Sequence, residues 1–534
     1  MKIYFLPAAI ALSAALWSCT DQAVNLEPKD SITYDVAFAT PERCDLAILG
    51  CYDAAQSGYY PGNDQRRGYP FGAASIEQGD MKGEDMVNTQ SFFAVTYDGT
   101  YNASSPNGQA HWECTYQMIN KINVVIEGLR AATENGTLTA AEASDGEAEI
   151  RFLRAMGLHE LLVFFSMPYG ATGDASHFGV PVSLEPINTV DKVAAAKEAG
   201  RLSVKQTYDQ ILEDLDYAEA NLNETRSGND KIVRATKAAA IAAKARIYQH
   251  MSDWNKVIAE SSKIVSASAP FSSPIGGYQL AARPDAVFAN NSSNTESLFS
   301  IENSDTDNPT TNGCLYQMYY GRSLVCVSPI IINASFWLAD DLRRAQLLEL
   351  GNRYGNKEAY WSTKYRSSLF ADYAPVLRYA EVLLNYAEAE ARVNGATQKA
   401  VDLLNAVRNR AVEDAGKHYT LASFANADAL VTAILEERRI EFLAEGRRWP
   451  DIHRLTYDPK FAVKAADGRA GVPNKAAFGN IESESYQPAS GSVPAGVVTT
   501  SGFNYEDRRY IFPIPESETS TNEKLASQQN PGWG

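Results

Sequence analysis

The stretch EAEIRFLRAMGLHELLVFFSM, from Glu147 to Met167, decides the fold class of this chain. Its apolar residues recur at intervals of three and four, which is the period of an α-helix that buries one face. The pattern stops at Pro168-Tyr-Gly170, a combination that ends helices because proline lacks the amide hydrogen and glycine favours turns. We therefore predict a helix over this stretch.

The same helical period appears in two separate blocks of the chain. The first block has Ala110–Arg130, Glu147–Met167, Val204–Leu222 with Ser203 as its N-cap, Thr236–Met251 and Trp254–Val265; the second has Leu377–Val393, Gln398–Ala411 and Leu430–Glu445. Short turns join these helices in pairs, and Ala238–Val265 and Arg378–Arg410 resemble tetratricopeptide repeats. We predict a mainly α fold, a scaffold of stacked helical pairs at approximately 110–268 and 375–455.

The remaining segments, at approximately 58–109, 269–374 and 456–534, lack a helical stripe and are rich in Gly, Tyr, Asn, Asp and Ser. They contain short β-like runs, such as Ser297–Ile301 and Leu324–Val327. Loops of this length are usually functional or disordered, and the aromatic content argues against disorder. We expect these irregular segments to fold together beside the helices and to form a ligand-binding face.

The first residues of the chain are those of a secreted protein. Lys2 precedes an apolar run, Ile3–Trp17, that is too short for a comfortable membrane span and ends at Ser18-Cys19. Leu16-Trp-Ser-Cys19 resembles a bacterial lipobox, whose cysteine is acylated; the alternative is an ordinary cleaved signal with Cys19 incidental. We predict a signal peptide at 1–18, a lipidated Cys19 and polar tether at 19–34, and one domain at 35–534.

Composition excludes several classes of function. The 534 residues carry a net charge of −17, which is unsuited to nucleic acid and to binding an anionic bilayer by charge. The six histidines are scattered and no nucleotide or serine-hydrolase motif occurs, so we expect no metal and no cofactor. Cys44 and Cys51 are too far apart along a helix to pair. Cys314 and Cys326 flank a possible hairpin, which makes them the candidate disulfide, and at least one of the five cysteines after Cys19 stays unpaired within the chain.

One charged segment is the best place for catalytic residues. Glu437, Glu441 and Glu445 recur every four residues, so their carboxylates share one helix face, and paired carboxylates are the machinery of glycoside hydrolysis. The alternative is that neighbouring arginines neutralise them and fix the helix in the scaffold; those arginines are Arg438, Arg439, Arg447 and Arg448. We favour this structural interpretation and predict no catalytic residue.

Several motifs together resemble the SusD/RagB family. They are Arg151-Phe-Leu-Arg-Ala155, the break at Pro168-Tyr-Gly170, Gly179-Val-Pro-Val182, the segment from Glu437 to Trp449 that continues to Arg454, and the ending Phe512-Pro-Ile-Pro515 with Asn530-Pro-Gly532. The resemblance implies a lipid-anchored, surface-exposed outer-membrane protein of Bacteroidota with a tetratricopeptide-like body. It also implies a nutrient ligand, usually a glycan, and a partner, a TonB-dependent outer-membrane transporter (a SusC-like barrel) that the protein covers as a lid.

A glycan presents apolar CH faces, on which aromatic rings stack, and hydroxyl groups, which polar side chains bind. Two irregular segments carry both kinds of residue, which gives these candidates: Asp80, Asp85, Tyr97 and Tyr101 in the first, and Asn303, Tyr316, Tyr319, Tyr320 and Arg322 in the second. We expect capture of an oligo- or polysaccharide, presumed neutral and therefore bound without dependence on salt. Capture of peptide or host protein is the alternative, and a surface glycoside hydrolase is a remote one.

Overall fold

The computed structural model describes residues 34–60, 65–353 and 357–533. The predicted signal peptide, Cys19 and all but the last residue of the predicted tether lie outside these ranges. Within the described ranges, no helix combines the length and the apolar character that crossing a bilayer requires.

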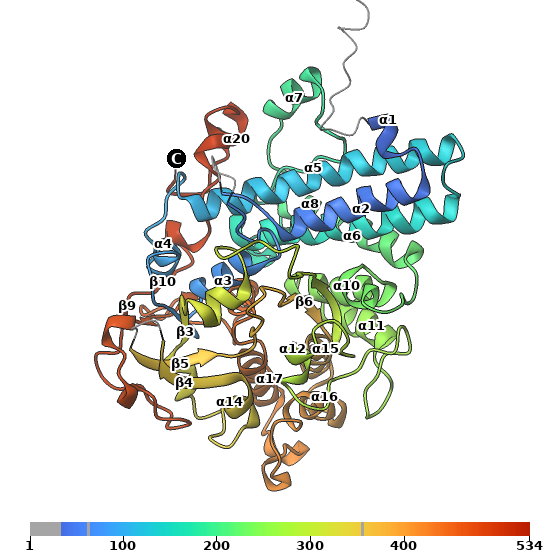
Figure 1. Ribbon diagram of the computed structural model, residues 1–534. Helices are drawn as coiled ribbons and strands as arrows, with labels where there is room; N and C mark the ends of the chain where they lie inside the picture. Colours follow the sequence, from blue (N-terminus) through green and yellow to red (C-terminus); the bar gives the residue numbers. More distant parts are fainter. Residues whose placement is uncertain (1–33, 61–64, 354–356, 534) are drawn as a thin grey trace, which may run out of the picture.

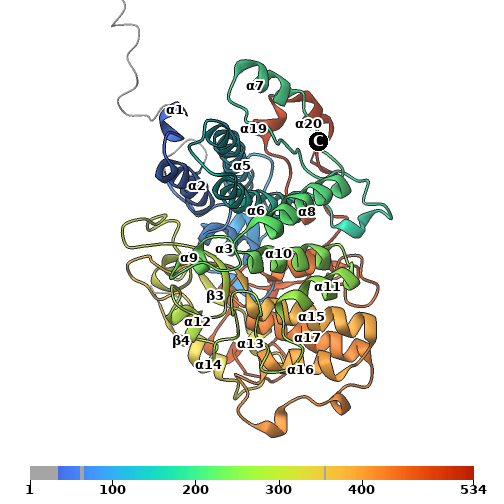
Figure 2. The same ribbon diagram turned by 90° about the vertical axis from the view of Figure 1, so that its right-hand side faces the viewer.

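Long helices form the body of the molecule. They are α2 (Pro41–Gln56), α5 (Pro106–Glu134), α6 (Ala140–Phe165), α8 (Val204–Asn221), α10 (Lys237–His250), α11 (Trp254–Ile264), α15 (Tyr379–Asn394), α16 (Gln398–Arg408) and α17 (Ala427–Glu441). From α5 to α11 each helix packs on the next, α11 packs on α15, and α15 packs on α16 and α17. Figures 1 and 2 show the resulting layers. The predicted scaffold of helical pairs is confirmed, and the contact between α11 and α15 joins the two blocks.

The ends of the helices follow capping chemistry. Ser203 is the N-cap of α8, as predicted: its hydroxyl accepts from the amide of Gln206 at 3.1 Å, and the Gln206 side chain accepts from the amide of Ser203 at 3.0 Å. Helix α6 starts seven residues before the predicted Glu147, behind a similar capping box made by Thr139 and Glu142. The polar first turns of α6 lack the apolar stripe, which is why periodicity missed them.

Shorter helices lie between and after the long ones: α1 (Tyr34–Ala37), α3 (Ala73–Lys82), α4 (Ala94–Tyr97), α7 (Val190–Lys197), α9 (Asp230–Val233), α12 (Ala286–Ala289), α13 (Pro329–Ile332), α14 (Leu342–Leu347), α18 (Arg448–Arg454), α19 (Glu516–Thr519) and α20 (Glu523–Ser527). Helix α3 falls in a segment predicted to lack helices. Every residue of α3 is buried, including Glu77, Gln78 and Lys82. Because polar residues occupy buried positions, α3 has no apolar stripe for sequence analysis to detect.

Within the described residues, the named strands are short and pair antiparallel in five separate couples. They are β1 (Met86–Asn88) with β3 (Val325–Val327), β2 (Ser297–Ile301) with β6 (Ala374–Arg378), β4 (Leu348–Asn352) with β5 (Glu358–Ser362), β7 (Gly471–Val472) with β10 (Phe503–Asn504), and β8 (Lys475–Ala476) with β9 (Val498–Thr500). The β1–β3 register aligns Met86 with Val327. This couple joins two of the predicted irregular segments, far apart in the sequence.

The predicted disulfide between Cys314 and Cys326 is wrong. Both thiols are free and buried, as are the other three cysteines of the described ranges. Cys326 lies on β3, which pairs with β1 rather than with the segment that carries Cys314, so the expected hairpin does not form. Burial raises the pKa of the Cys326 thiol to about 12, which keeps it protonated.

Candidate functional site

The charged segment at the end of α17 is an ion-pair network. Arg343 of α14 donates to Glu437 at 2.6 Å and to Glu441 at 3.0 Å. Arg378 of β6 binds Glu441 at 2.9 Å and Glu445 at 2.8 Å. Burial alone would raise the pKa of Glu441, but the surrounding arginines outweigh it and hold that pKa below its usual value. These ion pairs thus connect α17 and the residues after it to α14 and to β6.

The four arginines expected to neutralise these carboxylates have other partners. Arg438 pairs with Asp451, Arg439 with Asp85, Arg448 with Glu84, and Arg447 donates to the carbonyl of Val376. That part of the prediction is wrong, because the helix ends at Glu441 and the neutralising charges come from segments distant in sequence. The segment thus connects α17 and the residues after it to distant parts of the chain through ion pairs.

Two predicted ligand residues, Asp80 and Tyr319, are buried against each other. The Tyr319 hydroxyl donates to the Asp80 carboxylate at 2.6 Å, and the amide of Gly446 donates to it at 2.9 Å. Burial raises the pKa of Asp80 to about 7, although both hydrogen bonds oppose the shift. The structure therefore brings the two predicted segments together, but through bonds between their own side chains.

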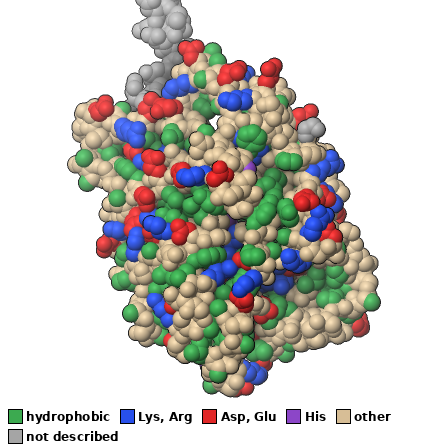
Figure 3. Space-filling view, turned by 180° about the vertical axis from the view of Figure 1, so that it is seen from behind, with side chains coloured by type: hydrophobic (Ala, Val, Ile, Leu, Met, Phe, Trp, Pro, Cys, Tyr) green, Lys and Arg blue, Asp and Glu red, His purple; other side chains and the backbone are tan. Residues whose placement is uncertain are grey.

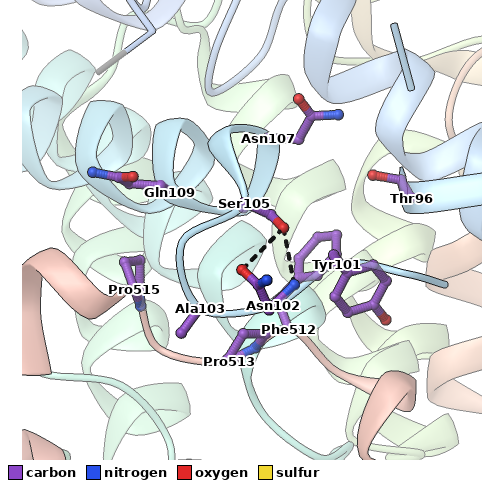
Figure 4. A pocket seen from close by; sticks show the side chains of 11 residues that line it. Thr96, Tyr101, Asn102, Ala103, Ser105, Asn107, Gln109, Phe512, Pro513 and Pro515 are labelled. Atoms are coloured by element: carbon purple, nitrogen blue, oxygen red, sulfur yellow. Dashed lines mark hydrogen bonds between the residues drawn. The ribbon is translucent and has the colours of Figure 1, made fainter. Parts of the chain in front are cut away.

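Four further predicted residues are also buried. Asp85 pairs with Arg439, the Tyr97 hydroxyl donates to the carbonyl of Ala476, the Tyr101 hydroxyl donates to the carbonyl of Arg509, and the Asn303 amide donates to the carbonyl of Asp372. Figure 4 shows Tyr101 beside Phe512 in a pocket that has no room for a water molecule. We omit these six residues from the candidate site, because a surface ligand cannot reach them in this structure.

The three remaining predicted residues, Tyr316, Tyr320 and Arg322, lie on and beside a π-helical turn, η2 (Gln317–Gly321). Met318 and Tyr319 point into the core, whereas Tyr316 and Tyr320 are half-buried, with their ring centroids 5.8 Å apart. Gly321 is required here: a Cβ at this position would stand 2.5 Å from the Tyr316 ring. Such π-helical turns occur often at functional sites.

Residues that the sequence did not reveal complete this surface. The Arg353 guanidinium lies 3.6 Å and that of Arg366 4.1 Å from the centre of the Tyr320 ring. Phe370 lies 6.2 Å from Tyr316, ring to ring. We call Tyr316, Tyr320 and Phe370 the platform. Arg353 follows β4 and Arg366 follows β5, and this unpredicted hairpin brings them to η2.

Hydrogen bonds hold the platform in place. The Ser323 hydroxyl donates to the carbonyl of Tyr320 at 2.8 Å, and the Thr89 hydroxyl donates to the carbonyl of Ser323 at 2.7 Å. Arg322 donates to the Asn312 side chain at 2.7 Å. The turn is thereby fixed to the end of β1, so the two tyrosines are presented in a defined orientation.

A cavity with a volume of about 630 Å³ lies elsewhere, between α5, α7 and α20. Its lining includes Trp112, Tyr116, Val193 and Leu525. Its lining is mainly apolar, which does not match the hydroxyl-rich surface of a sugar.

Figure 3 shows the side of the molecule opposite to Figure 1, where basic and acidic side chains are interspersed.

Among the side chains that the structure describes, no group of three or more His, Cys, Asp or Glu is arranged to hold a metal ion.

Two family models match the chain. Residues 352–533 match the model described as "SusD family", and residues 56–249 match the model described as "Starch-binding associating with outer membrane". The chain is also similar to "SusD-like protein P2" of Formosa agariphila, with 25% identity over 98% of both chains, and to "SusD-like protein P38" of the same organism, with 23% identity over 83% of this chain and 90% of that protein.

Solved structures have the same fold. A SusD superfamily protein from Bacteroides fragilis aligns with a TM-score of 0.72 and 24% identity, covering 91% of this chain and 99% of that one. A protein described as a "Laminarin binding SusD-like protein" aligns with a TM-score of 0.64 and 19% identity, covering 92% of this chain and 99% of the other. The helical stack with its irregular face is therefore a recurring architecture.

Proposed function

The chain belongs to the SusD/RagB family, and we propose that it is a cell-surface glycan-binding lipoprotein that captures an oligo- or polysaccharide on the platform. In this proposal it delivers the glycan to a partner TonB-dependent outer-membrane transporter, a SusC-like barrel. The protein would be held at the outer membrane by lipid on Cys19. The similarity to a laminarin-binding protein and to a family model whose description names starch supports the glycan.

The observation that carries this proposal is the pair of half-buried tyrosines on a rigid turn. Tyr316 offers a ring face for sugar stacking, and the guanidinium groups of Arg353 and Arg366, which lie on the neighbouring Tyr320 ring, have N–H groups that can donate to ring oxygens or hydroxyls. Fixing the rings beforehand lowers the entropy lost when a ligand binds. A stacking surface with adjacent donors is the arrangement that an amphipathic sugar requires.

The test is to remove each ring. Tyr316→Ala and Tyr320→Ala should each weaken binding of the cognate polysaccharide about fivefold to 100-fold, since a stacking contact contributes about 1–3 kcal/mol by analogy with base–aromatic stacking. Affinity gel electrophoresis against a polysaccharide panel identifies the ligand, and calorimetry then measures the change. The melting temperature should barely move, because neither ring belongs to the core.

Tyr457→Ala is the matched control. Tyr457 is 38% exposed, and its ring contacts Tyr505 rather than the platform. This variant should bind as the unmodified protein does. Unchanged affinity in both platform variants would place the site elsewhere. A panel without any binder would contradict glycan capture and favour the alternative of peptide capture.

A further inference from the structure

We infer that the platform takes an anionic polysaccharide, one that bears carboxylate or sulfate groups, and that Arg366 and Arg322 recognise those groups. This inference rests on the proposed function, and it replaces the neutral ligand expected from the sequence. It starts from Arg366, whose guanidinium lies on the Tyr320 ring, and from Arg322, which follows the same turn.

Arg366 is exposed, and its guanidinium carbon lies 4.1 Å from the centre of the Tyr320 ring. Within the described ranges its side chain forms no hydrogen bond and no ion pair. Asp372, the nearest carboxylate in sequence, attracts the Arg366 charge electrostatically, but its oxygens accept from the backbone amides of Arg366 and Ser367. A guanidinium stacked on an aromatic ring keeps its N–H groups free at the edges, where they can bind a planar or tetrahedral anion bidentately.

Arg322 also lacks a carboxylate partner among the residues that the structure describes, since its one hydrogen bond goes to the neutral side chain of Asn312. Glu77 interacts with Arg322 electrostatically, but burial and the neighbouring Asp80 raise the pKa of Glu77 well above its usual value. The charged form of that carboxyl group is therefore disfavoured, and Arg322 has no ion pair among the residues that the structure describes.

Arg353, on the contrary, is paired. It contacts the Tyr320 ring and binds Glu349 at 2.5 Å. Two arginines inside the scaffold are paired as well: Arg378 bonds three different glutamates and Arg454 bonds two acidic residues. Arg322 and Arg366 differ from these three arginines in having no carboxylate within ion-pair distance among the described residues.

Desolvation decides between the two kinds of ligand. A sugar that binds at the platform next to Tyr320 would remove part of the water around Arg366, which is costly for a charged group that gains only neutral acceptors. A carboxylate or sulfate gives charge-assisted hydrogen bonds in return. The net charge of −17 repels a polyanion, so an acidic protein that binds one needs cations at the contact itself.

Matched polysaccharides test the inference. Purified protein without residues 1–19 is titrated with laminarin as the neutral polymer, with polygalacturonate and its carboxyl-reduced form, and with carrageenan and its desulfated form. Binding should occur to a charged polymer and be lost when that charge is removed, which also identifies the group. Raising NaCl from 50 to 200 mM should weaken binding about fivefold.

The variants separate charge from fold. Arg366→Gln and Arg322→Gln should each lower affinity about 10-fold to 100-fold, and Arg366→Lys should recover part of it. Arg43→Gln removes an equally exposed arginine whose side chain donates only to the carbonyl of Val36, and it should leave binding unchanged. Binding to the neutral polymers alone, or binding insensitive to salt and to both substitutions, would overturn the inference and leave the proposed function intact. Failure to bind any polymer would overturn both.

Discussion

At the scale of single residues, Glu441 is where the ion pairs of the scaffold converge. Its carboxylate accepts from Arg343, Arg378 and Arg410, each from a different segment, and all four side chains are almost fully buried. Glu441→Gln should lower the free energy of unfolding by about 3–5 kcal/mol, because it leaves buried arginine charges uncompensated. Urea unfolding followed by circular dichroism measures the loss.

The control is Asp428→Asn, which breaks an ion pair with Lys460 whose two side chains are 49% and 60% exposed. That change should cost less than about 1 kcal/mol. The folded-state pKa of Glu441 lies below its unfolded value, so its stabilising effect is full above about pH 4.5 and disappears as the pH falls further. Melting curves should therefore be less acid-sensitive in Glu441→Gln than in the unmodified protein; equal sensitivity would contradict this assignment.

Residue type could be predicted from the sequence, but residue orientation could not. Tyr319 and Tyr320 are neighbours with similar surroundings in sequence, yet Tyr319 is fully buried and Tyr320 is half-buried, because successive residues of a helical turn point in different directions. Asp80 and Tyr319 were expected to bind a ligand, and they bind each other. Only the three-dimensional arrangement distinguishes a polar side chain that is accessible to a ligand from one that is hydrogen-bonded inside the protein.

At the scale of secondary-structure elements, the capping box of α8 offers a direct test. Ser203 accepts from the amide of Gln206, which would otherwise lack a partner at the start of the helix. Ser203→Ala should lower the free energy of unfolding by about 1 kcal/mol, whereas Ser203→Gly should cost only a few tenths. Thermal unfolding of both variants checks this order, and an equal loss in the two would contradict the capping role.

Periodicity succeeds where a helix has one buried face and fails where it has none or several. Helices α5 and α8 keep exposed residues opposite a buried face and were predicted within a few residues of their bounds. Helix α3 is buried on all sides, polar residues included, so it has no apolar stripe. The predicted helix to Glu445 ends at Glu441, because Ala444 and Gly446 adopt positive φ angles of 63° and 70°.

At the scale of the whole molecule, the five thiols of the described residues report on the integrity of the core. All are buried, and burial raises the pKa of the thiols of Cys51, Cys114 and Cys314 to about 12. A thiol reagent such as 5,5′-dithiobis(2-nitrobenzoate) should label none of them in the native protein and all five in urea, and reductant should not shift the melting temperature. Rapid labelling without denaturant, or a reductant-dependent melting temperature, would contradict this.

The helical stack could be predicted from the sequence because its contacts follow chain order, from α5 to α11 and from α15 to α17. The platform could be predicted only in part. Tyr316, Tyr320 and Arg322 were named because they cluster in sequence, whereas Arg353, Arg366 and Phe370 reach the same surface through the β4–β5 hairpin and the loop after it. Contacts between residues so distant in sequence form only when the whole chain folds, and they leave no local pattern in the sequence.

The last prediction concerns attachment of the whole molecule to the membrane. Cys19 ends an apolar leader with the spacing of a lipobox, and the net charge of −17 gives no attraction to anionic lipid head groups. Cys19→Ala should therefore release the mature protein from the outer-membrane fraction, which cell fractionation with immunoblotting measures.

Cys44→Ala is the matched control, since it removes a buried, free thiol and should leave the protein in the membrane fraction. The comparison is made both with and without the partner transporter, because a tight complex could retain the unlipidated protein. Retention of the Cys19 variant in cells that lack the transporter would contradict the lipid anchor. Retention only when the transporter is present would instead measure the strength of that partnership, and release in both backgrounds would leave the lipid as the dominant attachment.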